Sequence, residues 1–96
     1  MAVRLTIVVG EFEWDSGKAS TNEQKHGVTF DEALGVFADP ESVELADSVH
    51  RERFIVIGYS ARSRLLFVVS VERSDRTRII SARKGTKAEA RLYEEG

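Results

Sequence analysis

The sequence predicts a small α+β domain in which two N-terminal helices and a short C-terminal helix pack on an antiparallel sheet. Three observations indicate this class. Two capped helical segments lie in the first 40 residues, a series of β-rich segments joined by short turns follows, and a capped polar helical segment ends the chain. A chain of 96 residues is long enough for one such domain and too short for two. We therefore expect residues 1–96 to form a single domain.

The N-terminal segment combines strand and helix signals. "VRLTIVV", residues 3–9, is rich in β-branched residues and predicts a strand. "EFEW", residues 11–14, predicts a second strand or a continuation of the first. A helix is then predicted to run to about His26, with Asp15 or Ser16 as its N-cap.

The second helix has the clearer boundaries. Gly27 ends the first helix, and "TFDE" predicts a capping box with Thr29 as N-cap and Glu32 at the third helical position. The helix should end before Pro40, which disfavours helical backbone at the preceding residue. Helical spacing predicts one buried stripe, made by Phe30, Ala33, Leu34 and Phe37.

The remaining chain predicts an antiparallel meander and a last helix. Short turns separate segments that read as strands, and the most apolar of them is expected to be central in the sheet. These segments are residues 41–50, 53–60, 65–71 and 77–83. Thr86 and Glu89 then form a second predicted capping box, which opens a short polar helix.

Composition and charge limit the class of protein. The chain has no cysteine, and its longest apolar run, "LLFVVSV", is far shorter than the roughly 20 residues that span a bilayer. The first residues do not follow the pattern of a signal peptide, so we expect a cytoplasmic protein with no membrane contact. Residues 1–50 carry 3 Lys/Arg against 10 Asp/Glu, whereas residues 51–91 carry 11 against 4. This asymmetry indicates either a polyanion partner for the basic half or mutual neutralisation of the two halves across the fold.

Metal and nucleotide chemistry find no support in the sequence. His26 and His50 are the only histidines, and neither belongs to a spacing typical of metal ligands. The chain also has no phosphate-binding loop and no Gly-rich dinucleotide motif. We expect neither a metal nor a cofactor.

One group of candidate residues lies on the first predicted helix. Lys18, Asn22 and Lys25 follow i, i+4, i+7 spacing, and His26 lies four residues after Asn22, so the four side chains share one face. Such a face can bind a polyanion, or it can simply be a solvated polar face. At the C-terminal end of a helix the dipole favours a cation, which suits His26 to an acid or phosphate-binding role.

A second group lies at the end of the last predicted strand. Arg83 and Lys84 can grip a phosphate there, beside the start of the last helix. The alternative is that Arg83 pairs with a carboxylate such as Glu13 or Glu89. If no bulge intervenes, Arg78 points to the opposite face of the strand from Arg83.

Two further candidates begin the strand at residue 53. If the strand begins here, Glu52 and Arg53 face opposite sides, so at most one of them faces a given site. Trp14 can stack on a nucleic-acid base. Its apolar neighbours favour instead a core position or an interface anchor.

The combined motifs resemble those of a known family. "FEWD" (12–15), "KHGVTF" (25–30), "VFADP" (36–40) and "RIISAR" (78–83) resemble the BrnT family, the toxins of BrnT–BrnA type II toxin–antitoxin systems. The resemblance covers roughly residues 12 to 94. It implies a RelE-like fold, RNA cleavage, growth arrest, and neutralisation by a BrnA antitoxin with a ribbon-helix-helix DNA-binding part. Residues 1–11 exceed the usual lead before "FEWD" and are expected to add an edge strand or a dimer contact.

The residues can be assigned to the steps that metal-independent RNA cleavage requires. These steps are proton transfer, worth about 100 to 10,000-fold, and stabilisation of charge on phosphorus. Histidines titrate near neutral pH, so His26 suits either proton role. The expected catalytic residues are His26, Glu52 and Arg83. The expected RNA- or phosphate-binding residues are Lys18, Lys25, Arg53, Arg78 and Lys84, of which Lys18 and Arg78 are, like His26 and Arg83, matched to the family pattern.

A second hypothesis belongs to a different class. The chain can be a non-catalytic co-repressor module, whose acidic first half meets a basic or amphipathic antitoxin segment while the antitoxin supplies the DNA contacts. Either hypothesis implies a BrnA-like partner, and a homodimer or a toxin–antitoxin heterotetramer as the assembly. A structural domain without activity is the third interpretation.

Overall fold

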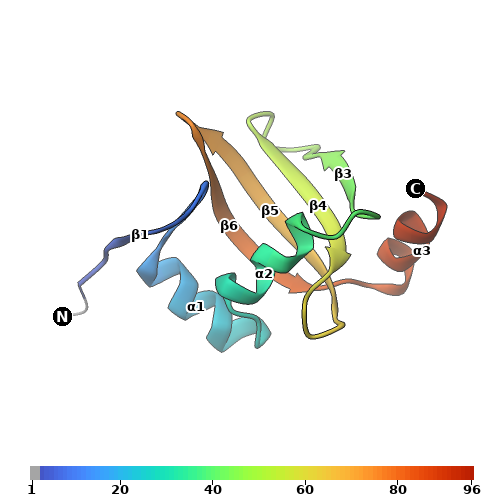
Figure 1. Cartoon of the computed structure of the whole chain (residues 1–96), viewed down its shortest axis with the longest axis horizontal. Coiled ribbons are helices and arrows are strands. Elements are labelled where there is room, and N and C mark those ends of the chain that lie inside the picture. Colours follow the sequence, from blue (N-terminus) through green and yellow to red (C-terminus); the bar gives the residue numbers. More distant parts are fainter. Residues whose placement is uncertain (1–2) are drawn as a thin grey trace.

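A computed structural model describes residues 3–96 as one six-stranded sheet with three helices (Figure 1). In chain order the elements are β1 (Thr6–Val9), β2 (Phe12–Asp15), α1 (Ser16–His26), α2 (Phe30–Phe37), β3 (Val43–Ala46), β4 (Arg53–Tyr59), β5 (Leu65–Arg73), β6 (Arg76–Lys84) and α3 (Lys87–Glu95). The α+β class and the order of the helices are as predicted. None of the helices in the described residues is long and apolar enough to cross a membrane.

The sheet is mixed, which corrects the predicted all-antiparallel arrangement. Its strand order is β1-β2-β6-β5-β4-β3, and β2 pairs with β6 in parallel, with Phe12 opposite Thr77 and Glu13 opposite Arg78. Every other neighbouring pair is antiparallel. Because two helices and three strands separate β2 from β6 in the chain, no short turn constrains their relative direction. As predicted, the apolar β5 is an inner strand.

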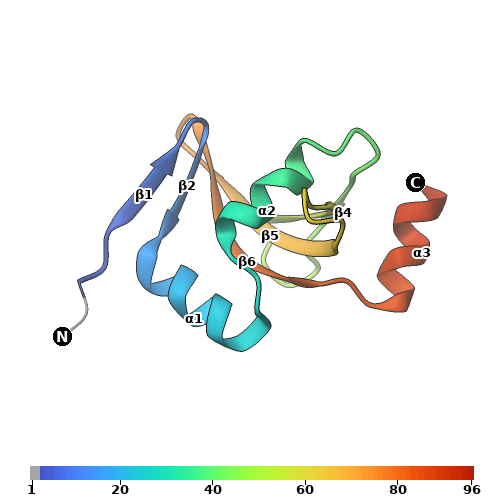
Figure 2. The same cartoon turned by 60° about the horizontal axis from the view of Figure 1, so that its bottom comes forward.

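The core lies between one sheet face and the helices α1 and α2 (Figures 1 and 2). Phe30 and Ala33 of the predicted stripe are buried, and Leu34 and Phe37 pack at the edge of the same core. Trp14 also belongs to the core, with its ring edge-on to Phe30 at 6.0 Å between centroids. The remaining buried apolar side chains of this core are Val28, Val36, Val56, Leu66, Val68, Ile79 and Ala82.

Most predicted helix boundaries are confirmed by their hydrogen bonds. Asp15, one of the two candidate N-caps of α1, accepts a hydrogen bond from the amide of Lys18 at 2.9 Å. Gly27 ends α1 with a φ of 66°, a left-handed conformation that glycine adopts without steric cost. Thr86 and Glu89 form the complete predicted capping box of α3.

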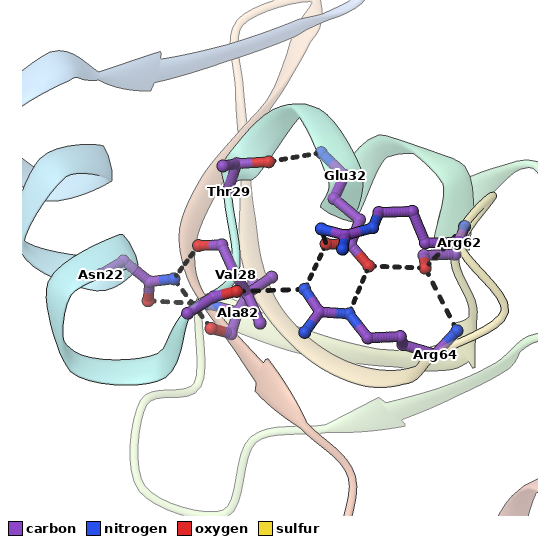
Figure 3. A network of polar contacts seen from close by, with 9 residues as sticks. Asn22, Val28, Thr29, Glu32, Arg62, Arg64 and Ala82 are labelled. Atoms are coloured by element: carbon purple, nitrogen blue, oxygen red, sulfur yellow. Dashed lines mark hydrogen bonds and ion pairs between the residues drawn. The ribbon is translucent and has the colours of Figure 1, made fainter.

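The capping box predicted for α2 is only half formed. Thr29 accepts the amide hydrogen of Glu32 at 3.1 Å, but the Glu32 carboxylate turns away to the β4–β5 turn (Figure 3). There it binds Arg64 through two hydrogen bonds, accepts the Ser60 hydroxyl at 2.7 Å and lies 3.6 Å from Arg62. Arg64, a stronger donor than a backbone amide, lowers the pKa of the Glu32 carboxyl to about 2. The Glu32 side chain is 5% exposed, so this ion pair fixes α2 to the sheet.

The helix α3 is attached mainly by polar contacts. It has no buried residue. The Tyr93 hydroxyl donates to Asp39 at 2.9 Å, and burial and this contact raise the pKa of Tyr93 to about 12. Tyr93 also packs edge-on to Tyr59 at 5.2 Å. These contacts place α3 beside the end of β4, away from α1 (Figure 1).

We expect Glu32 to make stability depend on acid pH. Its pKa is about 2 in the fold against 4.5 as an ordinary carboxyl, so its contribution is present above pH 4.5 and is lost as the pH falls towards 2. The contribution at neutral pH is on the order of 3 kcal/mol. Glu32→Gln imitates the protonated side chain, so the variant should be destabilised at pH 7 and should approach the wild type near pH 2. Urea denaturation across this range measures the difference, and a difference that does not vary with pH contradicts the prediction.

Candidate functional site

A pocket of about 340 Å³ lies where α1 meets the N-terminal segment and β6. It brings together three of the predicted site residues, Lys18, Lys25 and His26. The complete lining is Arg4, Lys18, Thr21, Asn22, Lys25, His26, Ile80 and Ser81, with no carboxylate among them. We call this the α1 pocket. A pocket lined by several cations and hydroxyls is suited to a phosphate group.

One buried amide holds α1 in place. Asn22 donates to the Ala82 carbonyl at 2.8 Å and accepts from the Ala82 amide at 3.1 Å, as a neighbouring strand would (Figure 3). It also donates to the Val28 carbonyl at 3.0 Å. Because β2 pairs with β6 only at Thr77 and Arg78, the β6 edge beyond them is open to this contact. Asn22 therefore attaches α1 to β6, whereas Lys18 and Lys25 of the same predicted face are exposed.

Lys18 and Lys25 are available for a ligand. Among residues 3–96, no carboxylate lies within 4 Å of either ammonium group, whereas Arg4 is paired with Asp15 at 3.1 Å. His26 is exposed in the last turn of α1. Of the two interpretations of this helix face, the pocket favours a binding face.

Three other predicted cations, Arg53, Arg78 and Arg83, lie on the sheet face that α1 and α2 leave uncovered. We call it the open face. Arg53 is opposite Val71, and Val71 is opposite Arg78, so these three residues form one row across the sheet. Arg83 is opposite Phe67, four residues along β5 from Val71, and its guanidinium lies 4.0 Å from the Phe67 ring centroid.

A bulge at Ile80 connects the open face to the α1 pocket. The β5–β6 register slips by one residue there. The extra residue turns Arg78 and Arg83 to the same face, whereas an uninterrupted strand would place them on opposite faces. Ser81, next to the bulge, lies in the open-face row of Val69 and also lines the α1 pocket. Ser81 is therefore common to the open face and to the lining of the α1 pocket.

The open-face arginines at positions 78 and 83 are already paired. Arg78 binds Glu13 at 3.0 Å, and both side chains are largely buried. Arg83 makes two hydrogen bonds of 2.8 Å to Glu89, which lower the pKa of that carboxyl, and it donates to the Lys84 carbonyl at 3.1 Å. The alternative in which Arg83 pairs with a carboxylate is thus observed, with Glu89 as the carboxylate.

Two predicted residues lie apart from both groups. Glu52 is in the turn before β4, 63% exposed, and its carboxylate lies 3.9 Å from Nδ1 of His50. Lys84 is exposed at the end of β6, opposite Leu66 on the helix-covered side. Neither lines the α1 pocket. Glu52 and His26 are therefore not brought together at this site.

Sequence reasoning missed Arg4, Thr21 and Ser81 as lining residues. A signal for Arg4 was present, because a tight turn at Gly10 and Glu11 pairs β1 with β2 and brings Arg4 beside the start of α1. Ser81 depends on the bulge, for which the sequence has no local signal.

Comparisons with known proteins concern the family and the fold of the chain. The model of the family described as the ribonuclease toxin BrnT of type II toxin–antitoxin systems matches residues 14–89. The 1.1 Å crystal structure of the Brucella abortus ribonuclease toxin BrnT is similar to this chain, with a TM-score of 0.63 and 21% identity. The similarity covers 77% of this chain and 94% of that one, and it shows the shared fold. A search of curated proteins found no match.

We expect Asn22→Ala to destabilise the fold by about 2 kcal/mol or more. The substitution leaves buried groups of Ala82 and Val28 without partners, at about 1–3 kcal/mol for each unsatisfied group. The matched control is Thr21→Ala on the same helix, where only an exposed contact with the Gly17 carbonyl is lost. That control should stay within about 0.5 kcal/mol of the wild type. Urea denaturation measures both, and equal stability of the two variants contradicts the role of Asn22.

Proposed function

Because the chain belongs to the family of BrnT ribonuclease toxins of type II toxin–antitoxin systems, we propose that it is an endoribonuclease that cleaves RNA without a metal ion and arrests growth. We further propose that residues 1–96 act as one RelE-like toxin domain in the cytoplasm, where the RNA substrate is found. The single observation that carries the proposal for this chain is the α1 pocket. The lining of the pocket includes an imidazole and two lysines that have no ion pair within residues 3–96, around a space large enough for a phosphate group.

The proposed reaction is attack of a ribose 2′-hydroxyl on the adjacent phosphorus. The new P–O2′ bond forms as the P–O5′ bond breaks, which leaves a cyclic phosphate and a 5′-hydroxyl. One proton leaves the 2′-oxygen and one reaches the 5′-oxygen. We assign one of these transfers to His26, because an imidazole is the side chain that most often serves as a general acid or base and His26 lines the pocket.

Lys18 and Lys25 supply the positive charge for the phosphate. Charge that is already in place stabilises the extra negative charge of the transition state without reorganisation. Thr21 and Ser81 add hydroxyl groups to the same lining. Proton transfer and charge stabilisation are thus both available from this chain's own side chains, which supports the metal-independent form of the proposal.

The structure changes the roles we assign to the other predicted residues. Arg83 is bound to Glu89 and stacked on Phe67, so we propose that it orders the open face and contacts the RNA backbone from its exposed side. Arg53 is the open-face arginine of the same row as Arg78 and has no ion pair within residues 3–96. We propose that it extends the RNA path, and we place Glu52 outside the reaction.

The partner we propose is a BrnA-like antitoxin with a ribbon-helix-helix part. In the complex, only the antitoxin contacts DNA. The family is one of toxin–antitoxin systems, which supports an antitoxin as the partner. The pairing of Arg78 with Glu13 and of Arg83 with Glu89 favours the alternative function, a non-catalytic co-repressor, because it neutralises two cations expected at the RNA.

Cleavage of RNA in the presence of EDTA distinguishes the two functions. We expect the wild type to cleave and His26→Gln to lose about 100 to 10,000-fold in rate, the range for a general acid or base. His50→Gln is the matched control, because His50 is the other histidine, is also exposed, and lies outside the pocket. It should keep full activity. A stable wild type that leaves RNA intact supports the co-repressor, and equal rates for both histidine variants remove His26 from the reaction.

Salt dependence tests the lysines independently of the chemistry. The dissociation constant of single-stranded RNA is measured against salt concentration for the inactive His26→Gln protein. Each lysine–phosphate contact that is removed should reduce the slope of log K against log salt by about 0.7 for a single strand, so the loss of two contacts should reduce it by about 1.4. We expect this for Lys18→Gln combined with Lys25→Gln, and no change for Lys87→Gln combined with Arg91→Gln on α3. A reduced slope in the α3 variant alone would place the RNA elsewhere.

A further inference from the structure

The strand β1 leaves an apolar edge of the sheet uncovered. It is the first strand of the sheet order, so one side has β2 as its neighbour and the other side has no strand (Figures 1 and 2). Within residues 3–96, four of the seven exposed large apolar side chains lie in β1 or in the three residues before it: Val3 (77%), Leu5 (58%), Val8 (49%) and Val9 (39%). Exposed apolar side chains beside an unpaired sheet edge are typical of interaction sites.

The backbone of β1 offers hydrogen-bonding groups on its outer side. Leu5 faces β2, because its carbonyl accepts from the Ser16 amide at 2.8 Å and its amide donates to the Ser16 hydroxyl at 2.8 Å. Since these directions alternate along a strand, the N–H and C=O groups of Thr6 and Val8 point outward. Natural edge strands are commonly protected by lysine, proline or a bulge, and Thr6–Val9 contains none of these.

This strand lies outside the part of the chain that matches the family. The family model begins at residue 14. The family match therefore assigns no partner to this edge. Thr6–Val9 carries no charged residue, so the strand offers no electrostatic preference for a foreign partner.

We propose that β1 pairs antiparallel with β1 of a second copy of this chain, so that the two six-stranded sheets join into one. In an antiparallel ladder, hydrogen-bonded and non-hydrogen-bonded pairs alternate, so residues that face each other must both direct their backbone N–H and C=O groups towards the partner strand or both direct them away from it. The two-fold axis of the dimer must therefore pass through a position at which one residue lies opposite the same residue of the second copy. With the axis at Ile7, the outward groups of Thr6 bond with those of Val8 in the other copy, which gives four hydrogen bonds by symmetry. This assembly does not depend on the ribonuclease activity proposed above.

The side chains favour the axis at Ile7. Leu5 then lies opposite Val9 of the second copy on the same sheet face as Ile7, so apolar residues meet apolar residues. An axis at Val8 would set Leu5 against Glu11 of the second copy. An axis at Thr6 would set Arg4 against Val8. Because pairing over five residues is a small interface, we expect a dimer dissociation constant of about 10 to 100 µM.

Single cysteine substitutions test the register, and the natural chain has no cysteine to interfere. In the proposed pair, the two Ile7 Cα atoms are about 4.5 Å apart, within the range of a disulfide. Ile7→Cys should therefore form a disulfide dimer on mild oxidation. The Leu5 positions of the two copies are about 13 Å apart, so Leu5→Cys alone should not form a disulfide dimer. A mixture of the Leu5→Cys and Val9→Cys proteins should form one, because these two positions lie opposite each other. Efficient disulfide formation at Thr6→Cys or Val8→Cys instead overturns the Ile7 register.

The oligomeric state tests the assembly itself. Analytical ultracentrifugation of the purified chain should show a concentration-dependent dimer. Val8→Lys should weaken it at least about tenfold by placing a charge in the pair. The matched control is Val49→Lys, at another exposed valine, which should dimerise like the wild type. Val8→Pro is a second variant that blocks the outer edge and keeps the bonds to β2, since the Val8 amide points outward.

Two results overturn the proposal. One is a wild type that stays monomeric at about 1 mM, far above the expected dissociation constant. The other is protection of the Thr6 and Val8 amides from hydrogen exchange only when antitoxin is added, which assigns the strand to the antitoxin. Neither result depends on whether the chain cleaves RNA, so failure of the dimer proposal can be distinguished from failure of the proposed ribonuclease function.

Discussion

The position of α1, and with it the α1 pocket, depends on the side-chain amide of Asn22. The helix contains one apolar residue, Ala19, and so it buries too little apolar surface to be fixed by the hydrophobic effect. Asn22 compensates by pairing with both backbone groups of Ala82 on the open edge of β6. Its third hydrogen bond, to Val28, fixes the turn that leads into α2. The Asn22 amide thus orients α1, satisfies two backbone groups on the edge of β6 and fixes the turn before α2.

The distribution of charge follows from a second constraint. The acidic half of the sequence and the basic half meet across the fold, as the pairs of Glu13 with Arg78 and of Glu32 with Arg64 show. Mutual neutralisation, one of the two interpretations of the charge asymmetry, is therefore observed. The consequence for anion binding is unexpected from composition. Lys18 and Lys25 of the α1 pocket, which form no ion pair in the described part of the chain, come from the acidic half.

Local signals in the sequence predicted local structure well. The caps at Thr29, Gly27 and Thr86 were predictable because each depends on residues within one turn. The parallel pairing of β2 with β6 could not be predicted from local signals, because it joins residues more than 60 positions apart in the chain. Glu32 shows how the two levels compete. Its spacing from Thr29 predicts a capping box, but a distant arginine supplies a stronger donor, and the tertiary contact prevails over the local one.

The same distinction applies to the site and explains the role of the N-terminal segment. Helical spacing placed Lys18, Lys25 and His26 together, whereas Arg4 entered the pocket only through the hairpin of β1 with β2. Arg4 also pairs with Asp15, the N-cap of α1. The segment that precedes the family's matched region therefore supplies both Arg4 of the α1 pocket and the edge strand of the assembly that we propose.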